Sequence, residues 1–139
     1  MSKLVEVLYP VPDLRRTPMS TLRWWESRRL VYNKVVGATG LVSLTGIYIL
    51  FLLGPASMGQ FTPYAMLVGA AMYGVAANVC YSIGWLLELA ARKLWGRRAP
   101  DIGPLLFRQG LIFSVGLTLL PLLVISVIWM VHVVLAIMK

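Results

Sequence analysis

The stretch VVGATGLVSLTGIYILFLLGPASMGQFTPYAMLVGAAMYGVAANVCYSIGWLL, residues 35–87, contains no Asp, Glu, Lys or Arg. A helix crosses the hydrocarbon of a bilayer with about 20 apolar residues, so this stretch is long enough for two crossings. As one helix it would be about 80 Å long, more than twice the hydrocarbon thickness. The chain is therefore expected to reverse within it. The segment GPASMGQFTP, residues 54–63, supplies Gly-Pro and Thr-Pro for that turn.

A second uncharged run, residues 109–138, is long enough for one further crossing. The chain is 59% hydrophobic, whereas soluble domains contain roughly 45–50% apolar residues. The sequence thus predicts an all-α integral membrane protein with three transmembrane helices, near residues 21–53, 64–90 and 108–137. A soluble three-helix bundle is disfavoured, because its helices would show a regular polar face.

The rest of the chain is expected to connect and flank these helices as one transmembrane domain, residues 21–139. Residues 1–20 carry Pro10, Pro12 and Pro18, which favour an extended arm over a helix. The first helix is expected to begin as an interfacial extension before its crossing starts near residue 31, with Ser20 or Thr21 as its cap. The loops are placed at 54–63 and 91–107. No cleavable signal peptide is expected, and Cys80, the single cysteine, excludes an intramolecular disulfide.

Basic residues are divided unequally between the two sides of the predicted membrane. The loop at 54–63 has no charge, and beyond Arg108 the only basic residue is Lys139. Lys and Arg in short flanks stay on the cytoplasmic side, which predicts an N-inside, C-outside topology. A bacterial inner membrane is the expected location, with an organelle membrane as the alternative. The basic residues behind this prediction are Lys3, Arg15, Arg16, Arg23, Arg28, Arg29, Lys34, Arg92, Lys93, Arg97, Arg98 and Arg108.

The segment LRWWESRRLVYNK, residues 22–34, combines basic and aromatic side chains directly before the first crossing. Aromatic side chains such as Tyr32 settle at the headgroup layer, and arginines bind lipid phosphates. A nucleic-acid surface is disfavoured, because these charges adjoin a transmembrane helix. The predicted partners are therefore anionic lipid headgroups. The residues assigned to them are Arg23, Trp24, Trp25, Arg28, Arg92, Lys93, Trp95, Arg97 and Arg98.

Small and polar residues recur at helical spacing within the predicted spans. In the second span Ala70, Gly74, Asn78 and Ser82 are four residues apart, and small residues let transmembrane helices approach closely. The favoured interpretation is that these residues pack helices together, and the alternative is that they line a polar path that includes Tyr81 and Glu88. We call each such row of small and polar residues a seam. The seam of the first span contains Asn33, Gly37, Gly40 and Ser43, and that of the third contains Gly110, Ser114 and Thr118.

Glu88 is the only acidic residue between Glu26 and Asp101. A carboxylate near the membrane is costly without a cation, so Glu88 is expected to form an ion pair with another helix. The candidate partners are Arg29, Lys34 and Arg108. A proton-carrying role for Glu88 is the less favoured alternative. His132 in the third span is not expected to bind metal, because no further ligand accompanies it.

No catalytic constellation, phosphate-binding loop or metal-ligand spacing is present, so a non-enzymatic protein without a cofactor is expected. The favoured hypothesis is a subunit or scaffold of a membrane complex, which binds its own copies or other transmembrane proteins through the small-residue seams and presents a basic cytoplasmic face. The alternative is a homo-oligomeric channel, carrier or pore-forming effector, with the face from Asn78 to Glu88 lining a polar path. An enzyme using Glu88, Tyr81 or His132 is disfavoured.

Overall fold

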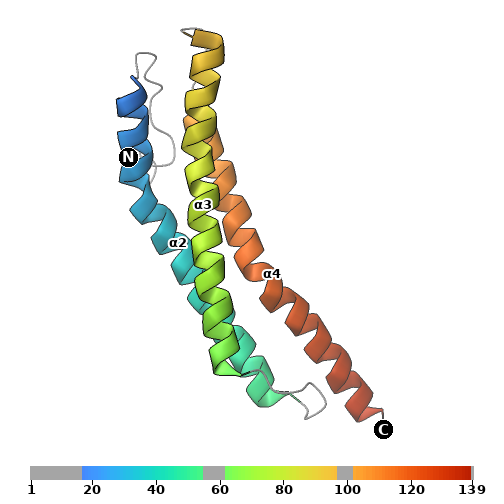
Figure 1. Cartoon of the computed structure of the whole chain (residues 1–139). Coiled ribbons are helices and arrows are strands. Elements are labelled where there is room, and N and C mark those ends of the chain that lie inside the picture. The colour runs from blue at the N-terminus through green and yellow to red at the C-terminus, as the bar shows by residue number, and fades with distance from the viewer. Residues whose placement is uncertain (1–16, 55–61, 97–101, 139) are drawn as a thin grey trace, which may run out of the picture. The chain divides into compact units, whose positions relative to one another are not determined.

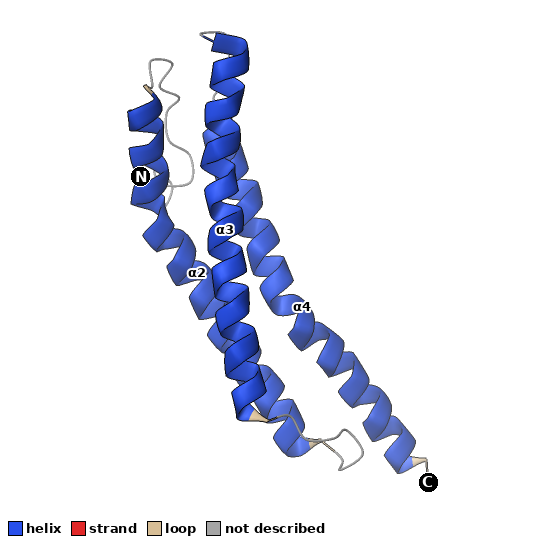
Figure 2. Cartoon of the chain, viewed as in Figure 1, coloured by secondary structure: helices blue, strands red, loops and turns tan. Residues whose placement is uncertain are grey.

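The computed structural model describes residues 17–54, 62–96 and 102–138, and every regular element in these ranges is helical (Figures 1 and 2). Helix α2 spans Pro18–Leu53, α3 spans Pro63–Trp95 and α4 spans Gly103–Ile137. All three are long and apolar enough to cross a membrane. The predicted all-helical chain with three candidate transmembrane helices is therefore confirmed at this level, and it supports an integral membrane location.

The helices extend further than the sequence predicted at the charged end. Helix α2 begins at Pro18, because Thr17 caps it in place of Ser20 or Thr21: the Thr17 hydroxyl accepts a hydrogen bond from the backbone N–H of Ser20 at 3.2 Å. Proline at the first helical position needs no such bond. Residues 1–16 of the predicted arm lie outside the described residues.

Helix α3 continues to Trp95 and α4 begins at Gly103, so the predicted loop at 91–107 is largely helical. Charged residues end a membrane crossing but not a helix, and Arg92 and Lys93 stabilise the carboxyl end of α3. Gly96 ends the helix with a positive φ of 57°, a conformation that glycine adopts without strain.

The chain divides into two compact units. Unit 1 contains Met1–Lys34 and Ala76–Phe113, and unit 2 contains Val35–Val75 and Ser114–Lys139. Each helix contributes a segment to both units. The units are described separately below, starting with unit 2.

Unit 2 packs through small and polar side chains. Ser43, Ser114 and Thr118 are buried, and a Cβ atom at Gly40 would lie 3.8 Å from the side chain of Thr118. The Tyr73 hydroxyl donates to the carbonyl of Ser114 at 2.9 Å, and the Thr118 hydroxyl lies 2.8 Å from Tyr73 Oη. Gly40 and Ser43 in α2 and Ser114 and Thr118 in α4 thus belong to contacts within the chain, where small residues permit close helix packing.

The helices are longer than a bilayer requires. They contain 36, 33 and 35 residues. At about 1.5 Å per residue each is about 50 Å long, while the hydrocarbon is about 30 Å thick. Roughly 20 Å of each helix must therefore be accommodated by tilt or lie beyond the hydrocarbon.

Candidate functional site

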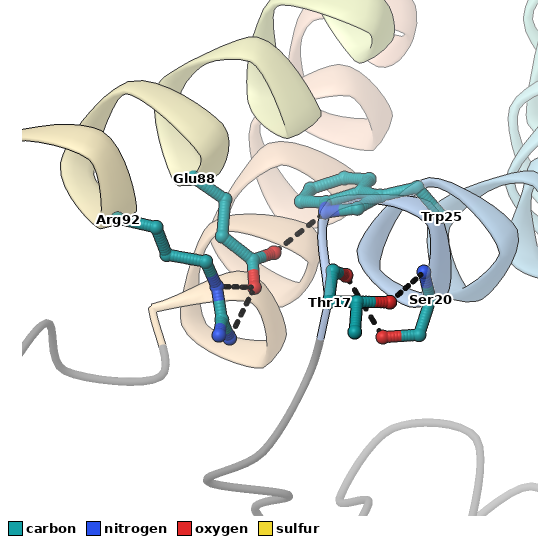
Figure 3. Close-up of polar contacts among 5 residues, drawn as sticks. All are labelled: Thr17, Ser20, Trp25, Glu88 and Arg92. Atoms are coloured by element: carbon teal, nitrogen blue, oxygen red, sulfur yellow. Dashed lines mark hydrogen bonds and ion pairs between the residues drawn. The ribbon is translucent and has the colours of Figure 1, made fainter. Parts of the chain in front are cut away.

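Glu88 of α3 is the centre of a buried polar cluster in unit 1 (Figure 3). Its side chain is fully buried, and Oε2 accepts a hydrogen bond of 2.7 Å from Nε1 of Trp25 in α2. A buried carboxylate is tolerated only when it is paired and hydrogen-bonded. The indole N–H satisfies one of the two oxygens and ties α2 to α3.

The other carboxylate oxygen forms an ion pair with Arg92, one helical turn further along α3. Arg92 Nη2 and Nε donate to Oε1 of Glu88 at 3.0 and 3.3 Å, and the Arg92 side chain is 17% exposed. The sequence predicted that Glu88 would pair with Arg29, Lys34 or Arg108, and it assigned Arg92 to lipid headgroups. The prediction overlooked Arg92 because it looked for a partner on another helix, although residues four apart face each other along one helix.

The amino end of α4 lies directly against the Glu88 carboxylate. Gly103 is buried, and a Cβ atom at this position would overlap Oε2 of Glu88. The first turn of a helix carries partial positive charge from its unpaired N–H groups, which favours a nearby carboxylate. Glu88 therefore interacts with all three helix segments of unit 1: with Trp25 in α2, with Arg92 in its own helix, and with the start of α4.

Further aromatic rings pack around Trp25, the residue that donates to this carboxylate. The ring of Trp25 packs edge-on against Tyr81 at 5.3 Å and Phe107 at 6.2 Å between centroids. The Tyr81 hydroxyl donates to the backbone carbonyl of Trp25, and the Tyr32 hydroxyl donates to that of Ala77. Edge-to-face pairs of this kind are favourable beyond the area that they bury.

The headgroup assignment is wrong for the two aromatic residues of α2 that lie in this core. Trp25 is only 2% exposed and Tyr32 only 3%. Both were assigned to the headgroup layer because basic residues flank them in the sequence. In the structure their side chains face α3. Trp24 is partly exposed, and the guanidinium of Arg28 lies 4.0 Å from the centre of its ring.

Arg29 links α2 to the predicted small-residue ridge of α3. Its Nη2 donates to the Ser82 hydroxyl at 3.1 Å, and it also pairs with Glu26 at 2.9 Å. Ser82 in turn donates to the carbonyl of Asn78. The guanidinium lies 5.3 Å from the centre of the Tyr81 ring. The structure thus brings Arg29, Tyr81 and Ser82 together, as part of helix packing in unit 1.

The remaining predicted residues lie outside the Glu88 cluster. Asn33, Lys34 and Gly37 are exposed in α2, while Ala70, Gly74 and Asn78 are partly exposed in α3. Arg23, Lys93 and Trp95 are exposed, and Arg108 is partly exposed. Arg97 and Arg98 lie outside the described residues. His132 bonds to the carbonyl of Ile128 through Nδ1.

The sequence missed three residues that shape the cluster: Gly84, Gly103 and Phe107. A Cβ atom at Gly84 would lie 2.7 Å from the Trp25 ring, so α2 and α3 meet there at close range. A search for small residues four apart beginning at Ala70 passes over Gly84. Gly84 could have been found from Glu88, because it lies four residues before Glu88 on the helix face that also contains Ala77 and Tyr81, and this face of α3 is buried.

The chemistry of the cluster is that of a structural connection. Both carboxylate oxygens of Glu88 are already engaged, one by Trp25 of α2 and the other by Arg92 of its own helix. Within residues 17–54, 62–96 and 102–138 there is no group of three or more His, Cys, Asp or Glu side chains that could hold a metal ion. In comparisons with known proteins, no family model, no curated protein and no solved structure matches the chain.

Proposed function

We propose that this chain is a small non-enzymatic integral membrane protein that serves as a subunit or scaffold of a membrane complex. The observation that carries the proposal is the open space at small residues in the spans. A Cβ atom added at Gly37 in α2, or at Gly110 in α4, would meet no heavy atom within 4 Å. Glycines in transmembrane helices favour close contact with another helix, and the described part of the chain provides none at these two positions.

The charged end of the helices is proposed to face the cytoplasm, in a bacterial inner membrane. The positive-inside rule supports this orientation, because Arg23 near the start of α2 and Lys93 near the end of α3 lie far along these helices from the uncharged residues 54–63. The exposed Arg23, Lys93 and Trp95 are suited to anionic headgroups, with each basic residue contributing about 1 kcal/mol near an anionic leaflet.

The channel alternative receives less support from the contacts. A polar path along the face from Asn78 to Glu88 needs side chains that face an aqueous space. Glu88 is fully buried and bonded to Trp25 and Arg92, and Tyr81 is buried with its hydroxyl on a backbone carbonyl. These contacts favour a structural role for both residues.

Substituting Gly110 with leucine is expected to remove partners from the gently purified complex without unfolding the chain. Open space at Gly110 accommodates the side chain within one copy, whereas a neighbouring helix seated on the glycine would be displaced. Native mass spectrometry of the detergent-extracted protein measures the result, with at least a tenfold loss of complex expected.

The matched control is Ile112→Phe in the same helix. Ile112 is 59% exposed, so this substitution adds bulk to the surface of α4 at a position where no glycine lets another helix approach closely. Complex formation should persist in this variant. A chain that is monomeric before any substitution, or that assembles equally well in both variants, would contradict the proposal.

A further inference from the structure

We draw no further inference here: the strongest candidate, the exposed polar face of α2 that carries Arg23, Ser27 and Lys34 in unit 1, carries no proposal because nothing in the structure shows what covers it.

Discussion

Replacing Glu88 with alanine is expected to destabilise unit 1 by about 3 kcal/mol. Removing one partner of a buried ion pair typically costs about 3–5 kcal/mol, and the lower value applies because Arg92 is 17% exposed and can turn toward water. The Trp25 indole N–H would also lose its acceptor. The unfolding free energy is measured by SDS titration in mixed micelles, with near-UV circular dichroism reporting on the packed aromatic rings.

Glu26→Ala provides the matched control, because Glu26 also pairs with an arginine of its own helix. Its side chain is 46% exposed, so an effect below about 1 kcal/mol is expected. Glu88→Gln should fall between the two, since an amide oxygen can accept from Trp25 but does not carry the charge that attracts Arg92. Equal effects of the two alanine substitutions would show that Glu88 is not the buried connection described above.

Substituting Gly84 with alanine is expected to cost about 1–3 kcal/mol, the usual range for overpacking a close contact. The added methyl group would lie 2.7 Å from Cη2 of Trp25. The indole cannot move away freely, because its N–H is bonded to Glu88 and its ring packs on Tyr81. A thermal or SDS unfolding midpoint measures the effect, and the near-UV tryptophan signal should change with it.

Gly69→Ala is the control on the same helix. No heavy atom lies within 4 Å of a Cβ at this position, and alanine is a better helix former than glycine by up to about 1 kcal/mol. Stability should therefore stay the same or increase. If alanine at Gly84 is tolerated as well as alanine at Gly69, α2 and α3 do not approach each other at Trp25.

The spans could be predicted because their signal is local. A run without charged residues identifies a crossing by length alone, and this is true of residues 35–87 and 109–138. The helix ends could not be predicted from the same signal, because the uncharged run ends before Arg92 and Lys93 while the helix continues to Trp95. The pattern of charged residues thus indicates which part of a helix is surrounded by lipid. It does not indicate where the backbone hydrogen bonds of the helix end.

The site was predictable only in part. The lone acidic residue at Glu88 and its need for a cation follow from the sequence, and Arg92 could have been chosen from its spacing. The bond from Trp25 to Glu88 joins residues 63 positions apart, and no periodicity reveals it. Trp25 lies among arginines in the sequence, and these neighbours led to the prediction that it contacts lipid headgroups. Its burial depends on how α2 and α3 pack against each other, which the sequence alone does not show.

If α2, α3 and α4 each cross a membrane, the two ends of every helix lie on opposite sides of it. Single cysteines at Thr17, Thr62, Lys93 and Met138, introduced in a Cys80→Ser background, test it in sealed vesicles with an impermeant maleimide. These positions lie at the helix ends or just beyond them. We expect positions 17 and 93 to react from one side of the membrane and positions 62 and 138 from the other. Labelling of all four from the same side, or of 17 together with 138, would contradict it.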